Sequence, residues 1–431
     1  MSCRRPRSPN NWGHGRRGLI RARHALPLPF EIAALVRQES SIHLDMKGYA
    51  EELMGRAQLA NVANIDRLNA YMDRHDLAAV VARSGQNFTY LSGIAYPGTL
   101  ARMLDLTDSP RGVMVFWPRE GQPCIILNRT AEPLTRRDSW IKQLELYEGY
   151  SESPYHRLCE VIKKAGLARD RIGIEMNYVS AAHWEEIRGL LPQVQLIDCT
   201  RIMDEVRWIK TPREITLLKD AADLLDGAYL DAFRATRLGD TERQLHSRIV
   251  FNCLDRGAGW VHGILSSSTN PINYGGEGDT AFQRGDIIRD DYIAYCTQGY
   301  PGHQSRNAIL GKPSNEQRRE YEIIRDVYDR TIERCRPGMR AGDVFGFVVK
   351  EFNKRGWEYK PMLVGHGVGS WWHQQEPIMS RDSDIVLEEG MVLAIEPHRG
   401  HWHIQDMIIV DRNGPKLLSD RFSTREMFVI E

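Results

Sequence analysis

An internal repeat in the second half of the chain constrains the fold more than any other feature. Gly239 precedes a helical run that ends at Gly257, and Gly338 precedes another that ends at Gly356. The two intervals between glycines have the same length. Two related units of helix and sheet that face each other leave a cleft at their interface, where ligand sites tend to lie. The alternative is that two amphipathic helices of equal length coincide by chance.

A strong helix start opens this repeated half. Thr211 offers a hydroxyl at the N-cap, Pro212 suits the first helical position, and Glu214 can close a capping box. Apolar residues then recur at three- and four-residue steps as far as Phe233, which gives the helix one buried face. We therefore place a domain boundary near residue 205, with the second domain at 206–431.

Residues 46–205 alternate between strand-like and helix-like segments. This alternation predicts a self-contained α/β domain. We expect helices at 65–75 and 180–191, strands at 77–82, 112–117, 123–127, 171–175 and 194–197, and a turn followed by a strand around 87–93.

Residues 1–45 differ in composition from the rest of the chain. Between Met1 and Ala22 there is no acidic residue, and arginines are interspersed with prolines and glycines. Such a segment cannot form a core. We predict a disordered leader, or an upstream extension with Met46 as the working first residue; the alternative is an arginine-rich targeting arm or nucleic-acid tail.

Overall composition narrows the possible partners. The chain has 57 basic residues (Lys and Arg) and 57 acidic residues (Asp and Glu), so its formal net charge is zero. A neutral chain has no overall electrostatic attraction for a nucleic acid. No apolar run approaches the ~18 residues of a membrane span. The seven cysteines are scattered without a Cys-x-x-Cys pair, which suits free thiols in a reducing compartment. We predict a cytoplasmic protein with a small-molecule substrate and neither a nucleic-acid nor a membrane partner.

Four segments of the second domain carry its candidate chemistry. They are 285–306, 365–373, 390–397 and 403–406. In the first and third, a carboxylate follows or ends an apolar strand-like run, and in the second, His366 and His373 flank a glycine-rich turn.

The second domain resembles the pita-bread family of methionine and Xaa-Pro aminopeptidases, prolidases and creatinase. The resemblance covers 206–431 through the helix opening at 209–214, the Gly-His-Gly-Val-Gly turn at 365–369 and the Glu-Gly-Met-Val-Leu-Ala-Ile-Glu-Pro strand at 389–397. It extends more weakly to the first domain, which is similar to the amino-terminal domain of creatinase and prolidase. It implies an α/β (α+β) protein whose carboxy-terminal pita-bread domain has a pseudo-twofold repeat, and it implies a homodimer.

The resemblance also assigns metal-ligand positions. The family's ligands are Asp, Asp, His, Glu and Glu; Asp291, His366 and Glu396 match, whereas His303 and Gln405 replace the second Asp and the last Glu. Both departures affect ligands that bridge two metals, and neither an imidazole nor an amide supplies a two-oxygen anion. A dinuclear centre is therefore not expected. The alternatives are one divalent ion (Fe, Mn, Zn or Co) held by these positions, or a metal-free cleft as in creatinase.

Other residues of the site are assigned by the same resemblance. His373 matches the histidine that contacts substrate and stabilises developing charge, and Asp291 could take a proton or orient water. The family's further histidine is missing, and the loop offers Tyr274 in its place as a candidate substrate-binding residue. His262 could compensate as a second candidate or could instead be structural.

Three more residues are candidates for substrate binding, each with a structural alternative. Trp371 and Trp372 could line a pocket or fill core. Arg399 could receive a substrate carboxylate, as part of a basic rim with the histidines at 398, 401 and 403, or belong to a solvated hairpin tip.

The leading hypothesis is a hydrolase that cleaves a carbon–nitrogen bond of a small amide, guanidino or Xaa-Pro dipeptide-like substrate. Under this hypothesis, Glu396 and His366 bind a metal ion or the substrate. One alternative is a carbon–sulfur lyase of the dimethylsulfoniopropionate type, which the stretch 269–271 and the spacing of Asp291 and His303 favour and Trp372 opposes. The other is a non-catalytic pseudo-peptidase that only binds.

Overall fold

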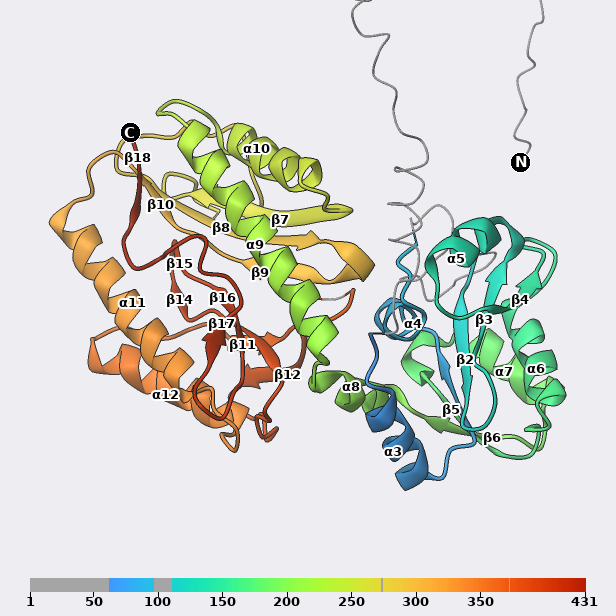
Figure 1. The fold of residues 1–431 in the computed structure, drawn as a ribbon. Coiled ribbons are helices and arrows are strands. Elements are labelled where there is room, and N and C mark those ends of the chain that lie inside the picture. Colours follow the sequence, from blue (N-terminus) through green and yellow to red (C-terminus); the bar gives the residue numbers. More distant parts are fainter. Residues whose placement is uncertain (1–61, 97–110, 273, 372) are drawn as a thin grey trace, which may run out of the picture. The chain divides into compact units, whose positions relative to one another are not determined.

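A computed structural model describes residues 62–96, 111–272, 274–371 and 373–431 (Figure 1). The predicted leader at 1–45, Met46 and Trp372 lie outside these residues. No helix in the described part of the chain is long and apolar enough to cross a membrane.

The first domain is built on a six-stranded sheet in the order β4-β3-β2-β1-β5-β6. Both faces of its central strand β1 are buried, with Val80 and Ala82 in one apolar cluster and Ala79 and Val81 in another. The strands are β1 Ala79–Ala82, β2 Met114–Pro118, β3 Cys124–Asn128, β4 Gln143–Tyr147, β5 Arg171–Ile174 and β6 Gln195–Asp198. The helices are α3 Ile65–His75, α4 Gly85–Ser92, α5 Glu132–Asp138, α6 Pro154–Lys164, α7 Ala181–Leu190 and α8 Thr200–Trp208.

The five strands and two helices expected in this domain are present within two residues at each end, but the expected strand around 87–93 is wrong. This segment is helix α4. The Ser84 side chain caps its first turn by accepting from the Asn87 N–H, and Gly93 ends it in the left-handed conformation with φ of 78°. These two caps outweigh the strand propensity of Phe88 and its aromatic neighbour Tyr90.

The second domain contains two further main sheets, each covered by a pair of helices (Figure 1). The first half has α9 Pro212–Ala235 and α10 Glu242–Asp255 with β7 Trp260–Ser267, β8 Ile287–Tyr295, β9 Pro301–Gln304, β10 Ala308–Leu310 and β18 Phe428–Ile430. The second half has α11 Asn315–Arg334 and α12 Ala341–Lys354 with β11 Leu363–Gly367, β12 Gln375–Ser380, β13 Val392–Ile395, β16 Asp406–Ile409 and β17 Lys416–Leu417. The small hairpin β14 His398–Arg399 and β15 Trp402–His403 belongs to this half.

The internal repeat and the capping box are both present. The two helices of the repeat, α10 and α12, are each 14 residues long. Gly239 and Gly338, which precede them, share a positive φ of 89° that favours glycine. At the start of α9, the Thr211 side chain accepts from the Glu214 N–H and the Glu214 carboxylate accepts from the Thr211 N–H. The predicted fold class is confirmed, while the boundary near residue 205, which lies within α8, stays a prediction.

A buried carboxylate links the two helices of the second half. Glu351 of α12 accepts hydrogen bonds from Lys354 of its own helix, from Arg355 at the C-cap of that helix and from Arg330 of α11. The bond from Lys354, followed by those from Arg355 and Arg330, lowers the pKa of Glu351 to about 2 in spite of the burial of the carboxyl.

We expect Glu351→Gln to lower the free energy of unfolding in a pH-dependent way. Because the pKa of Glu351 is lower in the folded chain than its ordinary value of 4.5, its charge stabilises the fold above that value, and this contribution is lost as pH falls toward 2. Its three basic partners are partly exposed, so we expect a loss of about 1–2 kcal/mol at pH 7. Urea titrations of both proteins between pH 3 and 7 measure this, and a constant difference across the range would contradict it.

Candidate active site

Two strands of the first half present their site residues on one face. Asp291, Ile293 and Tyr295 are alternate residues of β8, so their side chains lie on the same face of the strand. Ile293 pairs with His262 of β7 on one side and with His303 of β9 on the other. The register therefore places His262, Asp291 and His303 on a common surface.

The second half presents His366 and Glu396 through the tight packing of β11. His366 pairs with Ala394 of β13, and Glu396 follows two residues later on the same face. A Cβ at Gly365 would overlap the carbonyl oxygen of Ala394, and one at Gly367 would overlap that of Glu376. The glycines on both sides of His366 are therefore what lets this strand run between its two neighbours.

Three histidines meet at the centre of the site. The ring centroid of His303 lies 5.2 Å from that of His366 and 4.6 Å from that of His373, and the last two are 6.0 Å apart. The backbone N–H of His303 donates to the Met407 sulfur at 3.2 Å. Burial, reinforced by the neighbouring histidines, lowers the pKa of His303 well below its ordinary value and that of His373 to about 3. These two imidazoles are therefore neutral at pH 7.

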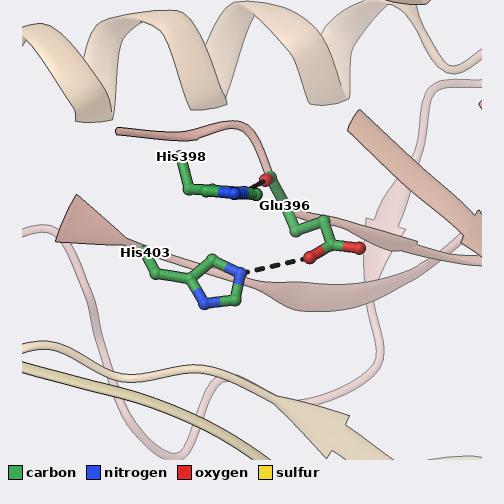
Figure 2. Close-up of side chains that lie close together, drawn as sticks. All are labelled: Glu396, His398 and His403. Carbon is green, nitrogen blue, oxygen red and sulfur yellow. Dashed lines mark hydrogen bonds and ion pairs between the residues drawn. The ribbon is translucent and has the colours of Figure 1, made fainter. Parts of the chain in front are cut away.

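Glu396 lies between the imidazoles of His366 and His403, and Figure 2 shows the contact with His403. Its Oε1 is 3.5 Å from His366 Nε2, and its Oε2 is 3.2 Å from His403 Nε2. His403 is completely buried, and burial lowers its pKa to about 4. The sequence placed His403 in the candidate segment 403–406 and in a basic rim, but it did not predict that His403 contacts Glu396. The useful signal was its position two residues before Gln405, because alternate residues of an extended segment face the same way.

Asp291 and Gln405 supply oxygens that lack hydrogen-bond partners. Asp291 Oδ1 is 3.6 Å from His303 Nδ1, too far for a hydrogen bond. Gln405 is completely buried and donates its Nε2 to the His303 carbonyl at 3.2 Å. Neither Asp291 Oδ1 nor Gln405 Oε1 has a hydrogen-bond partner among the described residues. Burial raises the pKa of Asp291 to about 6.

A wall of aromatic rings borders the histidine cluster. Trp260 stacks on His262 at 4.7 Å and on Tyr295 at 4.9 Å between ring centroids. The ring centroid of Trp371 lies 5.8 Å from that of Tyr295, and Trp371 has a left-handed φ of 65°. The backbone N–H of Trp371 donates to the Gly299 carbonyl at 2.7 Å. The Tyr295 hydroxyl is 3.2 Å from His373 Nδ1.

Two predicted substrate-binding residues lie at the periphery. Tyr274 is 65% exposed, with the Arg289 guanidinium 4.8 Å from its ring centroid. The Arg399 guanidinium lies 4.1 Å from the ring centroid of Trp357 and 3.5 Å from the Glu320 carboxylate. The structure thus gives Arg399 partners outside the histidine cluster.

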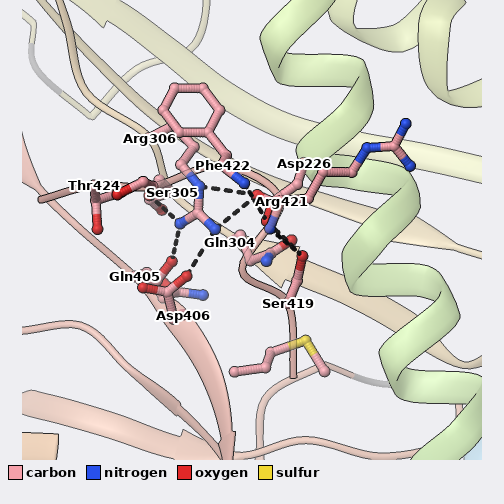
Figure 3. Close-up of polar contacts among 12 residues, drawn as sticks. Asp226, Gln304, Ser305, Arg306, Gln405, Asp406, Ser419, Arg421, Phe422 and Thr424 are labelled. Atoms are coloured by element: carbon pink, nitrogen blue, oxygen red, sulfur yellow. Dashed lines mark hydrogen bonds and ion pairs between the residues drawn. The ribbon is translucent and has the colours of Figure 1, made fainter. Parts of the chain in front are cut away.

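A buried arginine, Arg306, lies three residues after His303 and bonds the segment that carries Gln405 (Figure 3). Arg306 is completely buried, and its guanidinium bonds Asp226 of α9 and Asp406 of β16, each at 2.7 Å. It also donates to the Gln405 carbonyl at 2.6 Å. One side chain therefore ties the first half of the domain to the second directly beside the site.

Comparisons with known proteins agree with this architecture. Residues 216–413 match the protein family described as "Metallopeptidase family M24". Residues 64–209 match the domain family described as "Creatinase/Prolidase N-terminal domain". An Xaa-Pro dipeptidase of Lactobacillus helveticus is 30% identical over 254 residues, which cover 57% of this chain and 68% of that protein. An Xaa-Pro dipeptidase of Pyrococcus horikoshii is 28% identical over 367 residues, covering 82% and 96%. The chain belongs to metallopeptidase family M24.

Solved structures support the fold of this M24 protein. An Xaa-Pro dipeptidase from Bacillus anthracis has a TM-score of 0.71 at 20% identity, covering 85% of this chain and 98% of that one. A prolidase from Thermococcus sibiricus has a TM-score of 0.71 at 24% identity, covering 84% and 97%. Family membership confirms the predicted hydrolase of carbon–nitrogen bonds, and the peptidases named here do not support the lyase or the pseudo-peptidase.

M24 metallopeptidases use divalent metal ions, so the donor set of this chain must be tested against that requirement. The resemblance assigns His303 and Gln405 to the two bridging positions, and an imidazole and an amide there do not fit a dinuclear centre. The carboxylates of Asp291 and Glu396 and the imidazoles of His303 and His366 are ligand types that suit a single ion. Asp291 Oδ1 and Gln405 Oε1 have no hydrogen-bond partner among the described residues.

We expect Arg306→Met to destabilise the domain by more than about 3 kcal/mol, because it leaves two buried carboxylates without their counter-charge. The matched control is Arg412→Met, which removes an exposed pair with Glu389 and should cost at most about 1 kcal/mol. Chemical denaturation of both variants measures the difference. Equal losses would show that the buried pairs with Asp226 and Asp406 do not hold the halves together.

Proposed function

We propose that this M24 protein hydrolyses the carbon–nitrogen bond of an Xaa-Pro dipeptide or a closely related small amide. The observation that carries the proposal is the convergence of Asp291, His366, His373 and Glu396 from both halves of the domain. Relatives over both domains bear the name Xaa-Pro dipeptidase, which supports the choice of substrate class.

His373 is suited to stabilise the oxyanion. Its imidazole is neutral, and the Tyr295 hydroxyl can donate to Nδ1. A neutral ring that accepts at Nδ1 carries its proton on Nε2. We infer that this N–H donates to the substrate carbonyl oxygen as negative charge develops on it.

Asp291 is suited to accept the proton of the attacking water. Its Oδ1 is buried and has no hydrogen-bond partner among the described side chains, so it is available to a water molecule. Glu396 would bind the metal ion or, in its absence, the substrate, and His366, whose Nε2 is 3.5 Å from Glu396 Oε1, would contact the substrate. A divalent ion (Fe, Mn, Zn or Co), when bound, would polarise the carbonyl and lower the pKa of water.

The Trp260, Tyr295 and Trp371 rings give the proposed substrate an apolar surface beside His373. A pyrrolidine ring has no N–H once acylated and is bound by apolar contact. This wall supports the choice of a dipeptide that ends in proline.

We also infer a cytoplasmic homodimer. The described cysteines are all free thiols, which supports a reducing compartment. The dimer rests on the resemblance to prolidase and creatinase.

We expect His373→Ala and Glu396→Gln each to lower kcat/KM on an Xaa-Pro dipeptide by at least about 100-fold, because the first removes the proposed oxyanion donor and the second removes the carboxylate proposed to bind the metal ion or the substrate. Release of free proline measures the activity. The control is His401→Ala in the hairpin tip, outside the histidine cluster, which should stay within about twofold of the wild type.

Full activity in either site variant would refute the role given to that residue. A wild-type protein, assayed with each candidate metal, that cleaves neither Xaa-Pro dipeptides nor small amides would refute the proposed function.

A further inference from the structure

We propose that Glu396, His398 and His403 bind one divalent transition-metal ion, at a position shifted from that of the five family ligands. His398 and His403 have no counterpart among the five ligand positions assigned from the family resemblance. The inference concerns where an ion binds and not which bond is cleaved, so it can fail while the proposed hydrolysis stands.

The donor atoms of these three residues form a compact group. One ring nitrogen of each histidine and one Glu396 oxygen all lie within 4.8 Å of one another. His403 Nε2 and Glu396 Oε2 are 3.2 Å apart. Two ligands that bind a tetrahedral ion at about 2.1 Å lie roughly 3.4 Å apart, so this pair already has a suitable separation.

The family positions do not form such a group. Asp291 approaches His303 at 3.6 Å, and His366 approaches Glu396 at 3.5 Å, as two separate pairs. In the part of the chain that the structure describes, Glu396, His398 and His403 are the only three Asp, Glu, His or Cys residues with donor atoms this close together. Two imidazoles and a carboxylate are ligands that Zn²⁺, Fe²⁺, Mn²⁺ and Co²⁺ accept.

The β14–β15 hairpin holds the two histidines in place. His398 and His403 are directly opposite each other in its register, and their ring centroids are 4.8 Å apart. His398 Nδ1 donates to the Glu396 carbonyl at 2.9 Å (Figure 2). Such a bond fixes the orientation and tautomer of a metal-binding imidazole. The backbone N–H of His403 donates to Asn307 Oδ1 at 2.8 Å, which anchors the second strand.

Metal binding to the purified full chain tests the site. The protein is stripped with a chelator and titrated with Co²⁺, whose visible absorption reports the ligands, and Zn²⁺ content is measured after dialysis. The variants are His398→Ala, His398→Gln, His303→Ala at a family position, and His401→Ala as the matched histidine control in the same hairpin. Far-ultraviolet circular dichroism checks that each variant is folded.

We expect one ion per wild-type chain, binding at least about 100-fold weaker in both His398 variants, and binding within a few-fold of wild type in the His303 and His401 variants. Loss of the ion in His303→Ala, with or without loss in the His398 variants, would overturn the proposal, because it would place the ion at the family position. A wild-type chain that binds no ion, or His398 variants that bind as tightly as wild type, would also overturn it.

Discussion

The buried pairs that Arg306 makes with Asp226 and Asp406 are the interaction on which the site depends. The arginine follows His303 by three residues, and its guanidinium bonds the carbonyl of Gln405 as well as both carboxylates. Ser419 and Tyr328 donate to the remaining oxygens of Asp226 and Asp406, so both oxygens of each of these two carboxylates have a partner. A fully bonded buried network has one arrangement, which fixes the relative position of the two halves.

Most of the fold could be predicted from local patterns, because strand runs such as 124–128 and the capping box at Thr211 determine their own structure. Helix α4 could not, because the competition between its aromatic residues and its Ser84 and Gly93 caps is decided by small differences in free energy. The internal repeat could be predicted from the spacing of glycines. Gly239 and Gly338 have a backbone conformation that disfavours other residues, so glycine occurs at the same position in both halves.

The site was predictable only where the resemblance supplied a position for each residue. His366 and Glu396 come together as expected, but the burial of His403 and the partners of Arg399 depend on the hairpin register, which a single sequence does not contain. The residues predicted to form one basic rim therefore have different partners in the structure. His403 and His398 turn toward Glu396, whereas Arg399 pairs with Glu320.

The departures at His303 and Gln405 change the charge of the site as well as its ligands. If the resemblance assigns the ligand positions correctly, only Asp291 and Glu396 remain as carboxylates to balance a divalent ion, and two negative charges suit one ion rather than two. Glu396 then becomes the decisive residue, because its oxygens face different partners: Oε1 faces His366, and Oε2 faces His403. An ion bound on the Oε2 side would not use His366 or His373 as ligands, so both histidines could contact the substrate, and metal binding and substrate recognition would involve different residues.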